Sequence, residues 1–166
     1  MDAPNEGPAK QYGLVPPEVA ATMSGLELLQ GMMAGRFPRP PIMQLIGFHL
    51  AEVELGRAVF ESTPGLKHYN PLGSVHGGYA ATLLDSCMGC SIHTTLPKGT
   101  GYITLEFKVS LVRAITAETG PVRAEGKVLS SGRRAATAEG RLTDAGGRLL
   151  AHATTTCLIF EAHAKA

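Results

Sequence analysis

Residues 70–85 read N-P-L-G-S-V-H-G-G-Y-A-A-T-L-L-D, and this stretch decides the fold expected of the chain. It joins a polar, glycine-rich segment to a run of small and apolar residues that continues to Thr94 with Asp85 as its only charged residue. Such a run predicts a buried α-helix that begins near His76 and Gly77. An ionised carboxylate inside a buried helix is unfavourable by several kcal/mol. We therefore expect Asp85 either to have a polar partner or to take part in chemistry, and the second interpretation is favoured.

Runs with the pattern of β-strands lie on both sides of this helix. Before it, residues 48–53 and 57–62 flank a turn at residues 54–56 and predict a hairpin. After it come four longer runs separated by turn-rich segments, at residues 102–112, 121–130, 133–143 and 148–160. We expect these four runs to form an antiparallel meander. The order of elements predicts an α+β fold in which a curved antiparallel sheet of about six strands wraps around the long central helix, because no other segment can cover its apolar surface.

An N-terminal extension is expected at residues 1–41, ahead of a main domain at residues 42–161. Five apolar residues recur at helical spacing after a pair of prolines and predict one amphipathic helix: Val19, Met23, Leu26, Leu29 and Met33. The proline-rich segment 37–41 cannot lie inside a helix, so this helix should end before Pro38 and pack separately against the main body. A helix that covers the core is the simpler interpretation, and a lid over a ligand channel is the alternative.

Composition and charge exclude several classes of protein. The chain has 166 residues, of which 44% are hydrophobic, enough for one globular domain with a sizeable core. Fifteen Lys and Arg residues against fourteen Asp and Glu residues give a formal charge of +1, with no long basic run for nucleic acid. No secretory signal and no apolar stretch of bilayer length is found. We expect a cytoplasmic protein whose partners include neither nucleic acid nor a membrane.

The cysteines and histidines do not predict a metal or redox site. Cys87, Cys90 and Cys157 are an odd set, which argues against a disulfide framework. The C-x-x-C motif lies about three turns inside the predicted helix, away from the N-terminus where a thiolate would be stabilised, so we interpret these thiols as packing residues. The remaining histidines lack metal-binding spacing, and no nucleotide-binding or serine-hydrolase motif is present. No cofactor is expected.

The start of the predicted helix has the groups needed to stabilise an oxyanion. A helix N-terminus offers unpaired N–H groups and a partial positive charge, so Gly77 can donate to a carbonyl oxygen. Asn70 offers a second neutral donor, although an Asn in this position also commonly caps a turn. His76 can orient the loop or assist. Asp85 would then activate a water molecule or attack directly.

Helix geometry prevents one chain from completing this arrangement. Eight residues separate Gly77 from Asp85, a rise of about 12 Å, whereas reacting atoms must approach to roughly 3 to 3.5 Å. Two such helices that run antiparallel across a two-fold axis would bring Asp85 of one chain beside Gly77 and Asn70 of the other. The sequence therefore predicts an obligate dimer with two shared sites.

The motif N-P-x-G-x-V-H-G-G-x-x-A-x-L-x-D at residues 70–85, followed by residues 102–114 and Gly132-Arg133, resembles the hot-dog-fold acyl-CoA thioesterases of the phenylacetate-degradation type, within the 4-hydroxybenzoyl-CoA thioesterase superfamily. The resemblance covers about residues 45–160. It implies a strongly curved antiparallel sheet around a central helix, homodimers usually paired into tetramers, and hydrolysis of acyl-CoA thioesters.

The resemblance also implies roles for individual residues. By position, Asp85 matches the catalytic acid, Gly77 the amide that polarises the carbonyl, Asn70 the amide that orients the substrate, and His76 the residue beside it. Thr104 matches a hydroxyl that helps to hold the attacking water. We expect five further residues to contact the acyl-CoA, the arginines through its phosphates because Arg suits bidentate phosphate recognition: Gly78, Thr82, Arg113, Arg133 and Arg134.

Two alternatives to hydrolysis remain on the same fold. One is a module that binds or senses acyl-CoA without hydrolysing it. The other is a related acyl-CoA dehydratase, which needs a catalytic histidine paired with the acid across the site, and His76 is the candidate.

Overall fold

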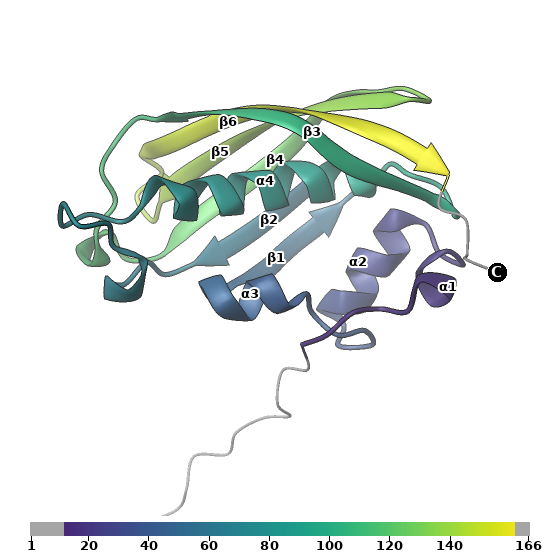
Figure 1. Cartoon of the computed structure of the whole chain (residues 1–166), viewed down its shortest axis with the longest axis horizontal. Helices are drawn as coiled ribbons and strands as arrows, with labels where there is room; N and C mark the ends of the chain where they lie inside the picture. The colour runs from purple at the N-terminus through teal and green to yellow at the C-terminus, as the bar shows by residue number, and fades with distance from the viewer. Residues whose placement is uncertain (1–11, 162–166) are drawn as a thin grey trace, which may run out of the picture.

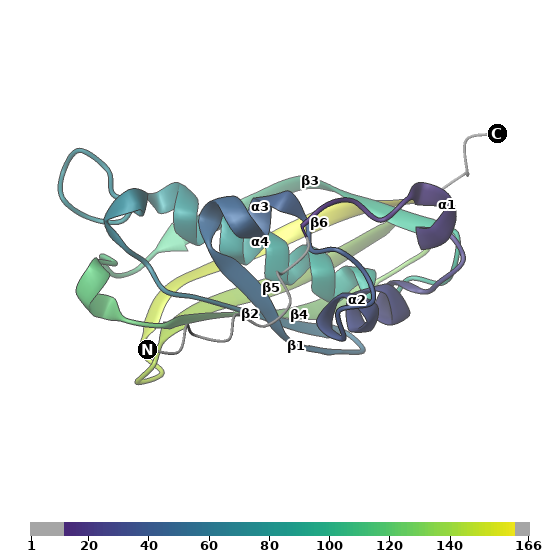
Figure 2. The same cartoon turned by 90° about the horizontal axis from the view of Figure 1, so that it is seen from below.

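A long helix and a curved sheet dominate the computed structural model, which describes residues 12–161. The helix α4 (Gly77–His93) lies along the concave face of the sheet (Figures 1 and 2). The sheet has six antiparallel strands: β1 (Phe48–Glu54), β2 (Arg57–Ser62), β3 (Thr100–Leu111), β4 (Val122–Ser131), β5 (Ala135–Asp144) and β6 (Leu149–Glu161). The predicted α+β fold, a curved six-stranded sheet around a central helix, is confirmed.

The strand order differs from the predicted meander at one strand. The order across the sheet is β1-β2-β4-β5-β6-β3, so β3 pairs with β6 and not with its sequence neighbour β4. The reason is that α4 carries the chain from β2 across the concave face to the far edge. Residues 112–121 then return past the start of α4, where the Val75 N–H donates to the Ile115 carbonyl at 2.8 Å. This return connection later forms a wall of the candidate site.

Two facing glycines let the sheet approach α4 closely. Gly126 of β4 pairs directly with Gly140 of β5. A Cβ atom on Gly126 would collide with the backbone carbonyl of Cys87, and one on Gly140 would lie 3.0 Å from the Met88 Cγ. Large helix residues such as Leu84 fill the remaining space and are fully buried. Burial of each such side chain contributes about 1.5–3 kcal/mol, so this contact fixes α4 firmly on the sheet.

The N-terminal region contains more helices than the single one predicted: α1 (Pro17–Ala20), α2 (Gly25–Met33) and α3 (Pro41–Ile46). The predicted helix is interrupted because Ser24 starts a new one. Its Oγ accepts from the Glu27 N–H at 3.3 Å, and the Glu27 carboxylate accepts from the Ser24 N–H at 2.8 Å. The Gly25 N–H donates to the Leu96 carbonyl just beyond α4. The first eleven residues of the predicted extension lie outside the described residues.

Candidate active site

The first turn of α4 presents an unpaired backbone donor. The N-cap residue is His76, whose Nδ1 accepts from the Gly78 N–H at 2.9 Å. The Tyr79 N–H donates to the His76 carbonyl, also at 2.9 Å. The Gly77 N–H, in contrast, has no acceptor among the residues that the structure describes. A free N–H at the positive end of a helix is suited to stabilise an oxyanion.

A cavity of about 230 Å³ opens beside this turn. Gly77 and Ala80 line it from α4, and residues 111–115 line it from the end of β3 and the loop that follows. A Cβ atom at position 77 would lie 2.8 Å from the Leu111 Cδ1. Any side chain there would therefore displace Leu111 and narrow the space. Glycine keeps the free N–H accessible to a small group in this cavity.

Asn70 both closes its own loop and lines the cavity. Its Oδ1 accepts from the Leu72 N–H at 2.9 Å and from the Ser74 N–H at 3.3 Å, which is the turn-capping role allowed by the sequence. Its Nδ2 donates to the Ser74 Oγ at 3.1 Å. An amide nitrogen carries two hydrogens, so one remains for a ligand. The capping role therefore does not exclude a substrate-orienting role.

Asp85 lies half-buried near the middle of α4 and has a polar partner. The Thr104 Oγ1 donates to its Oδ1 at 3.1 Å, and the same hydroxyl lies 3.9 Å from the Cys157 Sγ. Burial raises the pKa of Asp85 above its ordinary value of 3.8, and the hydrogen bond from Thr104 opposes that rise. No cation pairs with Asp85 within residues 12–161. A half-buried carboxylate without a cation is a candidate general base.

One chain does not bring these groups together. The helix α4 is continuous from Gly77 to His93, so Asp85 lies about 12 Å along the axis from the free N–H. The cavity at the start of α4 is lined by Asn70, His76 and Gly77 and does not include Asp85. The structure thus joins Asp85 with Thr104 in one group and Asn70, His76 and Gly77 in another.

The residues predicted to bind substrate lie at both ends of α4. Gly78 and Thr82 occupy successive turns, with the Thr82 Oγ1 donating to the Gly78 carbonyl at 2.8 Å. Arg113 is exposed, lines the cavity beside Gly77, and donates to the Leu149 carbonyl at 2.6 Å.

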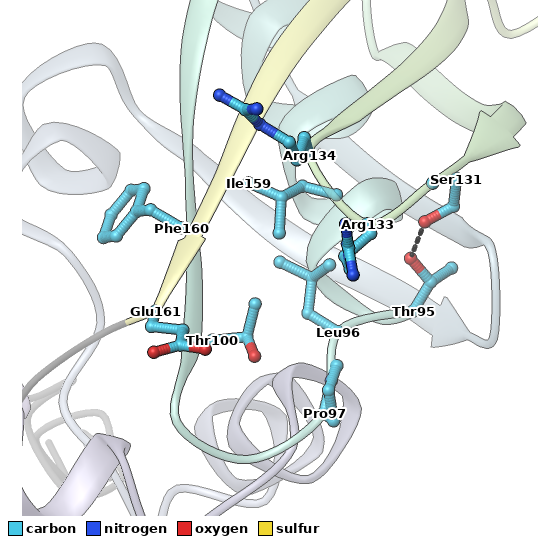
Figure 3. A pocket seen from close by; sticks show the side chains of 11 residues that line it. Thr95, Leu96, Pro97, Thr100, Ser131, Arg133, Arg134, Ile159, Phe160 and Glu161 are labelled. Atoms are coloured by element: carbon cyan, nitrogen blue, oxygen red, sulfur yellow. Dashed lines mark hydrogen bonds between the residues drawn. The ribbon is translucent and has the colours of Figure 1, made fainter.

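Arg133 and Arg134 line a second, larger cavity at the opposite end of the helix. This cavity has a volume of about 600 Å³ and lies where the β4–β5 turn meets the segment after α4. Figure 3 shows the Arg133 side chain near the hydrogen bond between Thr95 and Ser131, and the Arg134 side chain extending away from it. A single chain therefore does not place these two arginines with Arg113.

The thiols do not form a reactive or metal-binding centre in the described part of the chain. Cys87 is fully buried and its Sγ donates to the Leu84 carbonyl at 3.2 Å, while burial raises the pKa of Cys90 to about 12. Both are neutral thiols near pH 7. Within residues 12–161 no group of three or more His, Cys, Asp or Glu residues is placed to hold a metal ion. None of the helices in that range combines the length and apolar character needed to cross a bilayer.

Comparison with known proteins identifies the family. The model of the thioesterase superfamily matches residues 72–151, which include Gly77, Asp85 and Thr104. Over these residues the chain belongs to the thioesterase superfamily. The resemblance to hot-dog thioesterases of the phenylacetate-degradation type is thereby confirmed at the level of family and fold. A search of curated protein sequences finds no match to the chain.

Solved structures with the same fold include proteins of the phenylacetate-degradation type. A phenylacetic acid degradation-related protein from Ralstonia eutropha JMP134 is 27% identical, with a TM-score of 0.71 over 78% of this chain and 98% of that one. A variant of the phenylacetic acid degradation protein PaaI from Thermus thermophilus is 26% identical, with a TM-score of 0.64 over 71% and 97%. A Streptococcus mutans UA159 protein solved with acetyl-CoA bound is 23% identical, with a TM-score of 0.63 over 69% and 89%, and it shows the fold.

Proposed function

We propose that the protein hydrolyses an acyl-CoA thioester to free CoA and a carboxylic acid, in the cytoplasm, at a site shared between two chains. The observation that carries this proposal is the half-buried carboxylate of Asp85 bonded to Thr104 in a member of the thioesterase superfamily. The free N–H of Gly77 supplies the complementary donor for a carbonyl oxygen. The proposed reaction uses no metal ion and no redox cofactor.

The proposed mechanism divides the work between the two groups of residues. Gly77 N–H and Asn70 Nδ2 of one chain donate to the thioester carbonyl oxygen. Asp85 of the other chain takes a proton from a water molecule, whose oxygen attacks the carbonyl carbon, while Thr104 helps to hold that water. The tetrahedral intermediate then collapses, the C–S bond breaks with its electron pair on sulfur, and Asp85 returns the proton to the CoA thiol. Direct attack by the carboxylate is the alternative, and the short side chain of Asp favours the water route.

A sheet edge that has no pairing strand within residues 12–161 supports the pairing of two chains. The strand β3 pairs with β6 on one side and forms an edge of the sheet, visible along the top of Figure 1. It is twelve residues long, and Ile103, Leu105 and Leu111 on it are 55%, 59% and 59% exposed. A long apolar edge strand favours pairing with another chain. Antiparallel pairing of two β3 strands, in a dimer or a dimer of dimers, would also run the two α4 helices antiparallel.

This arrangement also reconciles the separated arginines. If Asp85 of one chain lies beside Gly77 of the other, Arg113 of the second chain flanks the reacting carbonyl. The cavity with Arg133 and Arg134 belongs to the chain that supplies Asp85 and begins at Thr95, ten residues beyond Asp85 and just past the end of its helix, about 15 Å away. The extended pantetheine arm of CoA spans a distance of this order. We therefore assign Arg133 and Arg134 to the phosphates of CoA.

We expect activity to fall in acid as Asp85 becomes protonated, because only the carboxylate accepts a proton from water. Since burial raises the pKa of Asp85, the acid limb of kcat/KM should lie above pH 3.8. Thr104→Val removes the hydrogen bond that lowers this pKa, so the limb should move to higher pH. The control variant Thr137→Val, on β5, should leave the pH of the acid limb unchanged. An acid limb that does not respond to Thr104→Val would contradict the assignment of Asp85 as the base.

The double variant Arg133→Ala/Arg134→Ala should raise KM for acyl-CoA by about fivefold or more and leave kcat nearly unchanged, because phosphate contacts far from the carbonyl contribute uniform binding. The matched control here is a second substrate, tested with both proteins. A thioester of N-acetylcysteamine, which lacks the nucleotide phosphates, should show the same KM with both proteins. If the double variant raised KM equally for both substrates, the two arginines would not act through the CoA phosphates, and their role would be structural.

A hydrolysis panel tests the proposed function as a whole. Short, medium, long and aryl acyl-CoA thioesters are incubated with the protein and free thiol is measured. We expect turnover of at least one class, which also identifies the acyl group. Tight acyl-CoA binding without turnover in any class would replace the proposal by the sensing module. The dehydratase alternative has less support, because the Nδ1 of His76 is engaged by the Gly78 N–H.

A further inference from the structure

Both ring nitrogens of His68 are engaged by backbone groups. His68 ends the short 3-10 helix η1 (Leu66–His68) and is half-buried. Its Nδ1 accepts from the Gly65 N–H at 3.0 Å, so the ring proton is on Nε2, which lies 2.9 Å from the Ile46 carbonyl as a donor. The ring therefore connects the end of α3 to the turn before η1.

The same residue is joined to the start of α4. The His76 N–H donates to the His68 carbonyl at 2.8 Å, one residue before Gly77. The His68 ring also packs against the ring of Tyr79, in the first turn of α4, with the centroids 4.6 Å apart. The Tyr79 hydroxyl donates to the Ser62 Oγ at 2.7 Å, in the buried end of β2.

We propose that His68 is a positioning residue that fixes the Gly77 amide for catalysis, an inference that rests on the proposed function. An oxyanion donor must be held to within about 0.5 Å, and a misplacement of about 1 Å can cost a factor of about 100 in rate. Loss of the His68 ring would leave the Gly65 N–H and the Ile46 carbonyl without their partner. The segment from Gly65 to His76 would then be free to shift, and the Gly77 N–H with it.

Three substitutions separate the contacts of this ring. His68→Asn keeps an acceptor near the Gly65 N–H, His68→Gln keeps a donor near the Ile46 carbonyl, and His68→Phe keeps the ring against Tyr79 but loses both hydrogen bonds. We expect His68→Phe to lower kcat by about tenfold or more with KM within about twofold, because the carbonyl contact matters most in the transition state. The Asn and Gln variants should lie between His68→Phe and the wild type. His49→Phe, the same change at an exposed position on β1, is the matched control and should keep full kcat.

Hydrogen exchange at the His76 amide provides a readout that does not depend on activity. We expect faster exchange in each His68 variant than in the wild type and in His49→Phe, because the acceptor of this N–H moves with the loop. A hydrolytically active wild type whose folded Asn and Gln variants keep full kcat and unchanged exchange would overturn the inference and leave the proposed function intact. If the wild type hydrolyses no acyl-CoA, the proposed function fails, and the catalytic role of His68 fails with it. Should His68→Phe not fold, the Asn and Gln variants decide the question.

Discussion

Replacement of Asp85 by asparagine should lower kcat about 100-fold or more, roughly 3 kcal/mol of transition-state stabilisation. Asparagine has the shape of aspartate, and its Oδ1 can still accept from Thr104, so the local structure should be retained. The amide cannot take a proton from water or act as a nucleophile, which removes the chemical step. Free-thiol release at saturating acyl-CoA measures the effect.

Thermal unfolding of the same variant checks that the loss is chemical. Burial raises the pKa of Asp85 in the folded state, so its ionised form lowers stability at any pH above that pKa. Asp85→Asn should therefore be at least as stable as the wild type at pH 7, and the difference should close as the pH falls below 3.8. Glu139→Gln, the same chemical change on the exposed side of β5, should alter neither activity nor stability appreciably. An Asp85→Asn variant with wild-type turnover would exclude this residue as the base.

Elements with a strong local signal were predictable from the sequence. The run of small and apolar residues before Thr94 predicted α4, and the hairpin at residues 54–56 was confirmed. The position of β3 was not predictable in the same way. Strand patterns specify which residues are extended but not which strands pair, and the pairing of β3 with β6 depends on the path that α4 imposes on the chain.

The N-terminal helices show a second limit of the pattern. Apolar spacing alone continued one helix through Ser24, although Ser24 and Glu27 together form a capping box that starts a new helix. The capping box was therefore present in the sequence, but the regular spacing of the apolar residues predicted one continuous helix.

The sequence indicated the residues of the candidate site but not all of their contacts, and the catalytic roles assigned to these residues stay predictions. The motif at residues 70–85 singled out Asp85, and the family resemblance added Thr104; the structure joins the two by a hydrogen bond. The turn-capping role of Asn70 was foreseeable, because the backbone groups that it accepts from lie two and four residues away. The motif did not reveal that His68 supports the start of α4, because the contact of its ring with the Ile46 carbonyl joins residues distant in the sequence. Short-range spacing cannot show such contacts, since they arise only when η1, α3 and α4 have packed together.

Mixed dimers should recover activity that neither parent has. The parents are Asp85→Asn and Asn70→Asp, the latter chosen because it keeps acceptors for the Leu72 and Ser74 N–H groups while removing the Nδ2 donor. Each homodimer should be nearly inactive, since every site lacks either its base or its carbonyl donor. In a dimer with one chain of each kind, one site inherits both defects. The other site receives an intact Asn70 from the first parent and an intact Asp85 from the second.

The amount of recovered activity follows from random pairing. About half of the dimers are mixed after co-refolding of equal amounts, and half of the sites in those dimers are intact, so activity should approach about a quarter of the wild-type value. Native mass spectrometry of the same sample confirms the fraction of mixed dimers. The matched control mixes Asp85→Asn with Thr104→Val, which impair the same half-site and should give no activity above the mean of the two parents.

The activity of confirmed mixed dimers of Asp85→Asn and Asn70→Asp is the most direct test of a site shared between chains. Recovery to about a quarter of wild-type turnover is the result that the shared site predicts. Turnover that stays at the level of the two parents, in a sample where about half of the dimers are mixed, would show that each site is built within one chain.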